Sequence, residues 1–95
     1  MSNFNPSGTT TYSTRDFWLA GALLASGKML LHLDWEERRA HFIFADLTGC
    51  ELSTQAYWAG DMMVSAKAFT DALRTLKSRI YENGKHTKLP NTAGN

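Results

Sequence analysis

Two histidines and an aspartate fall on a predicted β-hairpin: His32, Asp34 and His41. With the turn at Glu36–Arg39, paired residue numbers sum to 75, so Asp34 faces His41 and His32 lies diagonal to it. Two imidazoles and a carboxylate on one sheet face suit a divalent metal or an acid–base pair. A solvated face with one favourable charge pair is the simpler interpretation, because ligating histidines need partners that fix their tautomer. We therefore expect no metal site and no cofactor.

The single cysteine, Cys50, stands near the predicted start of a helix, where a thiol pKa falls and nucleophilic chemistry becomes conceivable. No oxyanion-hole segment accompanies it, so a small packed residue is the favoured interpretation. Gly49, Gly60 and Gly84 are isolated and form no phosphate loop, and GxSxG, HExxH and GxGxxG motifs are missing. The sequence thus predicts a protein that is not an enzyme, with no catalytic residues and no small-molecule substrate.

Basic residues on two elements are candidate contacts for a macromolecule. They are Arg38 and Arg39 at the hairpin tip, and Lys67, Arg74 and Lys77 on the last helix. Four aromatic residues would offer stacking surfaces for bases: Trp35, Tyr57, Trp58 and Tyr81. Acidic neighbours such as Asp71 and Glu82 dilute the positive field that phosphate binding needs. Weak nucleic-acid binding by the basic helix face and the hairpin tip is therefore the alternative function.

Protein contact is the favoured function. A narrow sheet leaves exposed edges that can pair with a second copy or with a partner strand. Met62 and Met63, next to Tyr57 and Trp58, suit an adaptable contact surface, although the methionines would also serve to close the core. The sequence therefore predicts a non-enzymatic protein-interaction module, with a protein partner or self-association ahead of nucleic acid.

Composition narrows the class but not the partner. The 95 residues suffice for one domain. The 10 basic and 9 acidic residues give a net charge of +1, which does not indicate a particular class of partner. A lone cysteine excludes an internal disulfide and cysteine-based zinc sites, and favours the cytoplasm. The start of the chain lacks signal-peptide features, and the apolar run from Phe17 to Ala25 is too short to span a membrane.

The elements that must position these residues follow from periodicity. We expect flexible tails over 1–11 and 84–95 and a single domain over 12–83. A first helix starts at Ser13 or Thr14 and ends at Gly27, and its thin middle at Gly21 and Ala22 would pack closely on a sheet. Its expected apolar face comprises Phe17, Ala20, Leu23 and Leu24.

In the hairpin, Leu31 faces Phe44, Leu33 faces Phe42 and Trp35 faces Ala40, all on one side. The turn lacks Asn-Gly, which favours a four-residue loop. These pairings define the predicted sheet.

A helix from Cys50 to Ala59 stops at Gly60, and Met62–Val64 forms a link or a short strand. Ser65 caps a last helix that closes at Asn83-Gly84. Its apolar stripe comprises Ala66, Phe69, Leu73, Leu76 and Ile80, with Ala72 beside it. The predicted fold is a small α+β domain of order α-β-β-α-α, with an antiparallel hairpin packed on helices and an extra edge strand near Thr10–Tyr12.

Four segments resemble a family of short bacterial and phage proteins known only as a domain of unknown function. They are Tyr12–Asp16, Phe42–Phe44, Ala56–Gly60 and Leu76–Ile80. The resemblance covers about residues 11–82 and rests on structural rather than catalytic positions. It implies a prokaryotic or phage setting and brings no catalytic residues.

Overall fold

The computed structural model describes residues 10–87. Along the chain lie β1 (Thr11–Thr14), α1 (Phe17–Ala25), β2 (Leu30–Glu36), β3 (Arg39–Ala45), α2 (Leu47–Ala59) and α3 (Ala66–Thr87). The predicted α+β domain, with a central antiparallel hairpin and an extra edge strand, is confirmed. Residues 1–9 and 88–95 of the predicted tails lie outside the described residues. Regular structure extends past both predicted boundaries, because Thr11 belongs to β1 and residues 84–87 belong to α3.

The strand β1 replaces the predicted first turn of the first helix. Ser13 and Thr14 pair with β3, and the sheet order is β1-β3-β2 with both pairs antiparallel. Asp16 is the N-cap of α1, because its Oδ1 accepts hydrogen bonds from the backbone N–H groups of Trp18 at 3.0 Å and Leu19 at 3.1 Å. The predicted start at Ser13 or Thr14 is therefore wrong. Hydroxylated and aromatic residues of this segment favour a strand, and a better cap follows them.

The hairpin has the predicted register over most of its length. Leu33 pairs with Phe42, and in the three following pairs toward the turn the two residue numbers also add up to 75. A bulge puts Leu30 rather than Leu31 opposite Phe44, so Leu31 is 43% exposed and the prediction for it is wrong. The predicted four-residue loop is also wrong. Only Glu37 and Arg38 lie between the strands, at φ values of 52° and 70°, as a tight two-residue turn of left-handed residues requires.

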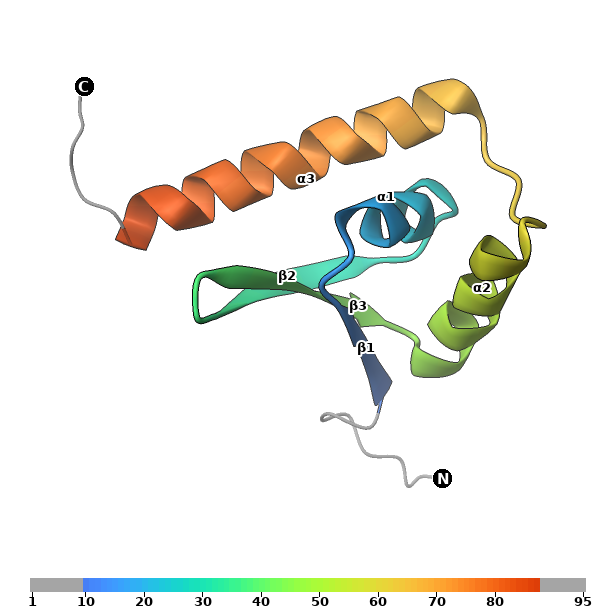
Figure 1. Cartoon of the computed structure of the whole chain (residues 1–95), viewed down its shortest axis with the longest axis horizontal. Coiled ribbons are helices and arrows are strands. Elements are labelled where there is room, and N and C mark those ends of the chain that lie inside the picture. The colour runs from blue at the N-terminus through green and yellow to red at the C-terminus, as the bar shows by residue number, and fades with distance from the viewer. Residues whose placement is uncertain (1–9, 88–95) are drawn as a thin grey trace.

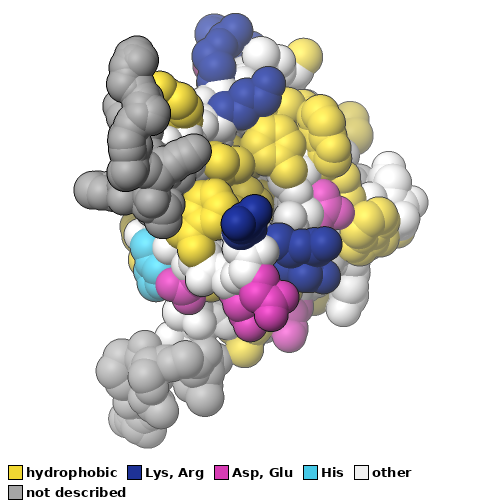
Figure 2. Space-filling model, turned by 60° about the vertical axis from the view of Figure 1, so that its left-hand side comes forward, with side chains coloured by type: hydrophobic (Ala, Val, Ile, Leu, Met, Phe, Trp, Pro, Cys, Tyr) yellow, Lys and Arg dark blue, Asp and Glu magenta, His cyan; other side chains and the backbone are white. Residues whose placement is uncertain are grey.

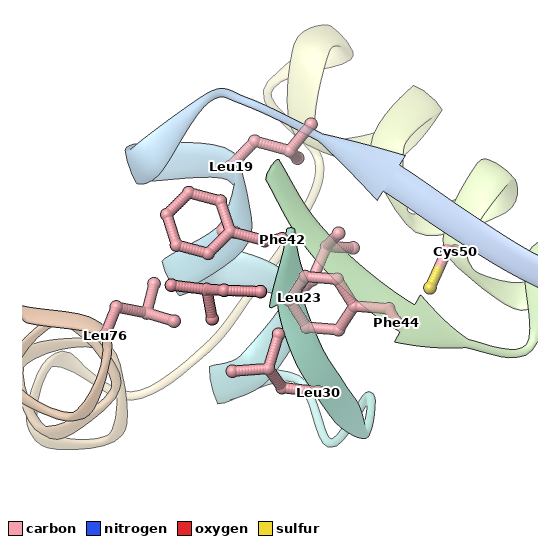
Figure 3. Packing of buried hydrophobic residues seen from close by; sticks show 9 residues of the cluster. Leu19, Leu23, Leu30, Phe42, Phe44, Cys50 and Leu76 are labelled. Carbon is pink, nitrogen blue, oxygen red and sulfur yellow. The ribbon is translucent and has the colours of Figure 1, made fainter. Parts of the chain in front are cut away.

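The core lies between the sheet and the helices. In Figure 1, α1 lies against the sheet, α3 runs over α1, and α2 stands beside the β1 end. Phe42 and Phe44 of β3 meet Leu23 of α1 and Leu76 of α3 (Figure 3), and all four are at most 2% exposed. This burial is the main stabilising contribution of so small a domain.

Packing on two sides explains why α1 is apolar nearly all round. Its buried residues run consecutively from Leu19 to Leu23, instead of following the single predicted face. The close approach expected at Gly21 is made to α3 and not to the sheet. A Cβ at this position would lie 2.5 Å from Cδ2 of Leu73 and 3.4 Å from Cε1 of Phe69.

The last two helices agree with the prediction at two of their four ends, Gly60 after α2 and Ser65 before α3. Helix α2 begins at Leu47, earlier than the predicted Cys50, and ends at Gly60, whose φ is 81°. The Ser65 hydroxyl accepts the N–H of Ala68 at 2.9 Å, as predicted for the cap of α3. The predicted end at Asn83-Gly84 is wrong, since α3 continues to Thr87.

The segment at Met62–Val64 is a link without regular structure and not a strand. Over residues 10–87, no helix combines the length and apolar character that a membrane crossing requires.

Candidate interaction surface

The histidines of the hairpin belong to two separate pairs, and the side chain of His41 is half-buried. His32 Nε2 lies 3.6 Å from Asp34 Oδ1 on the same strand, whereas His41 Nε2 lies 3.3 Å from Glu36 Oε1. Asp34 is the backbone neighbour of His41, as predicted, but the side chain of His41 turns to the diagonal Glu36. Among the described residues, no three His, Cys, Asp or Glu side chains gather in a way that would hold a metal ion.

Cys50 lies in the first turns of α2 and is fully buried. Its Sγ donates a hydrogen bond to the backbone oxygen of Ala45 at 3.4 Å. Burial raises the pKa of the thiol; Lys28 lowers it and Asp46 raises it by smaller amounts. Burial thus outweighs the helix start, which alone would lower the pKa, and the packed interpretation of Cys50 agrees with the structure.

The Cys50 thiol should therefore be protected in the folded protein. We expect iodoacetamide to alkylate it at least about 100-fold more slowly in buffer than in denaturant, because reaction requires opening of the core. A Cys50→Ala/Glu51→Cys variant, with its thiol at the adjacent exposed position, provides the control and should react rapidly in both conditions. Equal rates for native and denatured wild-type protein would contradict the buried placement.

The same pKa shift predicts how stability depends on pH. Folding raises the pKa of the Cys50 thiol, so the protonated thiol stabilises the folded state at pH values below the pKa of the unfolded chain, which is near the ordinary value of 9.0. This stabilisation is lost as the pH rises through the pKa of the folded protein. Above about pH 9, the free energy of unfolding should fall more steeply for wild type than for Cys50→Ala. Urea titrations of both proteins between pH 7 and 10.5 measure this, and parallel pH profiles would contradict it.

The five predicted basic residues do not form one patch. Lys67 Nζ and Arg74 Nη1 each lie 3.2 Å from an oxygen of Asp71, which neutralises part of this exposed helix face. The hairpin tip with Arg38 and Arg39 lies toward the opposite end of α3 from Lys67 (Figure 1). On the face that includes the hairpin end, basic and acidic side chains lie beside one another (Figure 2). Lys77 is exposed on α3.

An apolar groove lies where α1, the end of α2, the following link and the start of α3 meet. Its volume is about 260 Å³, and we name it the corner groove. Its lining residues are Ala22, Tyr57, Gly60, Met62, Val64 and Phe69. Helix α1 contributes its small Ala22 to the floor, while Gly60, in a left-handed conformation, ends α2 and turns the chain into the link. The groove thus places Ala22 of α1 against the continuous segment 57–69, which is distant from it in sequence.

Large exposed side chains lie next to residues that line the corner groove. The Trp58 ring packs edge-on against Tyr57 at 4.9 Å between centroids, and the Trp18 ring lies 6.5 Å from that of Phe69. Trp18 is 56% exposed, Trp58 66%, and Met63 of the link 88%. Sequence reasoning identified Tyr57, Trp58 and the two methionines but missed Trp18. The available signal was that Trp18 falls outside the apolar face predicted for the first helix.

The corner groove brings residues of three helices and the link together, and none of its lining residues takes part in a salt bridge. An arrangement of tryptophan, tyrosine and methionine around an apolar hollow can bind apolar side chains. Comparisons with protein-family models, with curated proteins and with solved structures found no match.

Proposed function

We propose that this protein is a non-enzymatic protein-interaction module that binds an apolar segment of a partner protein in the corner groove. The observation that carries the proposal is the exposure of Trp18, Trp58 and Met63 around an apolar hollow built by three elements. The proposal includes a bacterial or phage setting, which the family resemblance implies, and a cytoplasmic location, which the lone cysteine favours.

The physical reason is the free energy of leaving large apolar side chains in water. Burial of apolar surface gains about 25 cal/mol per Å², and tryptophan is enriched among the residues that dominate binding energies. Methionine adapts its shape to different partners because its side chain is unbranched and flexible. Covering the rings and Met63 with a partner would therefore be strongly favourable.

The size of the groove favours a side chain over a small-molecule ligand. At about 260 Å³ it falls below the range of roughly 300–1,000 Å³ that is usual for ligand pockets. The groove is open and apolar, without the convergent polar groups that orient a substrate. One or two apolar side chains from a partner helix or loop fit this chemistry.

Nucleic-acid binding remains the less supported alternative. Phosphate binding depends on clustered, unopposed positive charge, and Asp71 holds both Lys67 and Arg74. We expect single- and double-stranded oligonucleotides to bind weakly and without sequence preference. Fluorescence titration at two salt concentrations measures this. Sub-micromolar, steeply salt-dependent binding that a Lys67→Glu/Arg74→Glu variant abolishes would make nucleic acid the partner instead.

Trp58→Glu should abolish partner binding without unfolding the protein, because it puts a charge beside the apolar groove. Loss of one dominant ring lowers affinity by about 30-fold or more. The experiment captures partners on immobilised wild-type protein and identifies them by mass spectrometry. The dissociation constant of each partner is then measured with wild type and with Trp58→Glu.

Leu52→Glu is the matched control, because Leu52 lies on the same helix, is similarly exposed at 61%, and does not line the groove. It should leave binding unchanged. Equal loss in both variants, or unchanged binding by Trp58→Glu, would contradict the proposed surface. Circular dichroism of all three proteins shows whether the fold is retained.

A further inference from the structure

The strand β2 has a free edge. Within the described residues the sheet order is β1-β3-β2, so β2 has a neighbouring strand on one side only. The two-residue turn makes Glu36–Arg39 a hydrogen-bonded pair, and hydrogen-bonded and non-hydrogen-bonded pairs alternate from there. The backbone groups of Leu33 and Trp35 consequently point away from β3. The strand has seven residues and contains neither proline nor lysine, two residue types that commonly protect sheet edges.

We propose that β2 pairs with β2 of a second copy of this chain, antiparallel and with Leu33 opposite Leu33 of the second copy. The two three-stranded sheets then become one six-stranded sheet with twofold symmetry. The proposal concerns a different surface from the corner groove and does not rest on the proposed function.

Geometry limits the pairing to a few registers. In a symmetric antiparallel pair, opposite residues point to the same sheet face, so the two residue numbers must have an even sum. The twofold axis therefore lies midway between the two copies of one β2 residue, so that this residue pairs with itself across the dimer. The registers available to the regular part of the strand are centred on His32, Leu33, Asp34 or Trp35.

Charge decides among these four registers. Centring on Leu33 places each His32 opposite Asp34 of the other copy, twice in the dimer, so an imidazole meets a carboxylate at both positions. Centring on Asp34 places two aspartates opposite each other, and centring on Trp35 places Asp34 opposite Glu36. Centring on His32 brings two imidazoles together. The Leu33 register alone pairs an imidazole with a carboxylate of the other copy without placing two carboxylates or two imidazoles opposite each other.

Exposed apolar side chains support the same register. Leu31 and Trp35 are 43% and 38% exposed, and this register brings each Leu31 level with Trp35 of the second copy. The bulge between Leu30 and His32 limits regular pairing at that end. The contact is therefore small, and a dissociation constant on the order of 10–100 μM is expected.

Sedimentation equilibrium of the full chain from about 5 to 500 μM tests the association. The average mass should rise from 10.6 kDa toward twice that value. Asp34→Asn should weaken association several-fold, whereas Glu51→Gln, which removes a charge from an exposed residue of α2, should not. A constant mass of 10.6 kDa at all concentrations would overturn the proposal. So would a rise in mass that Trp58→Glu abolishes and Asp34→Asn leaves intact, because the corner groove would then be the interface.

Cross-linking tests the register. Under mild oxidation, a mixture of His32→Cys and Asp34→Cys proteins should form a disulfide-linked dimer, because these positions are directly opposite and close enough for a disulfide. Each variant alone should remain uncross-linked, and wild type should too, because Cys50 is buried. Cross-linking of Asp34→Cys alone or His32→Cys alone would place the axis on that residue and overturn the proposed register, as would no cross-linking of the mixture.

Discussion

Phe42→Ala is expected to lower the free energy of unfolding by about 3–5 kcal/mol, the range for emptying a buried aromatic site. Phe42 is 2% exposed and lies on the central strand β3, opposite Leu33 of β2 and Thr14 of β1. Its ring contributes to the cluster that joins the sheet to α1 and α3 (Figure 3). Truncation therefore leaves a cavity at the point where three layers meet, and the rigid neighbours cannot fill it.

A loss of this size would consume much of the total stability. A domain of this length has a free energy of unfolding of roughly 5–14 kcal/mol, so the variant should be marginal at 37 °C. Urea unfolding at 25 °C measures the change. Leu31→Ala is the control, because the bulge leaves Leu31 exposed, and it should cost less than about 1 kcal/mol. Equal costs at the two positions would contradict the observed register.

The hairpin shows what alternation can predict. Alternation predicts that Leu33, Phe42 and Phe44 share one face, because a slip of one residue would move every apolar side chain into water. That constraint holds in the structure, where all three are buried. Alternation does not indicate where a strand contains the extra residue of a β-bulge, so the exposure of Leu31 could not be predicted from it.

The start of the first helix and the hairpin turn were predicted wrongly because local sequence preferences did not decide the structure there. Ser13 and Asp16 both have cap chemistry, and pairing of Ser13 with Ile43 decided between them through a contact distant in sequence. The turn residues Glu37 and Arg38 adopt positive φ without the glycine or asparagine that usually signals it. In both cases tertiary structure overrode local preference.

The candidate site was predictable in part. The spacing of Lys67, Asp71 and Arg74 at i, i+4 and i+7 indicated that the acid would oppose the bases, and the ion pairs agree. The corner groove could not be predicted as a site, because Ala22, Tyr57 and Phe69 meet only through the packing of three helices. Sequence alone indicated adaptable aromatic and sulfur-containing residues, without their common location.

The close approach of α1 to α3 yields the second large effect: Gly21→Val should destabilise the protein by about 1–3 kcal/mol. A Cβ added there would lie 2.5 Å from Cδ2 of Leu73, and the branched side chain of valine would add two more carbons beside the same contact. Gly21→Ala should be nearly neutral, because the end of Leu73 can move and alanine gains about 1 kcal/mol over glycine inside a helix. Steric conflict with α3, and not loss of backbone freedom, is therefore the expected cause.

A double-mutant cycle identifies the partner in this conflict. Leu73→Ala removes the side chain that meets the new atoms, so Gly21→Val/Leu73→Ala should be more stable than the sum of the single changes predicts, by about 0.5–3 kcal/mol. Thr75→Ala, an exposed position on the same helix, should show no such coupling with Gly21→Val. Urea unfolding of the variants gives both coupling energies. If Leu73 and Thr75 gave equal coupling, the cost at Gly21 would arise within α1, and the observed contact between α1 and α3 would not explain it.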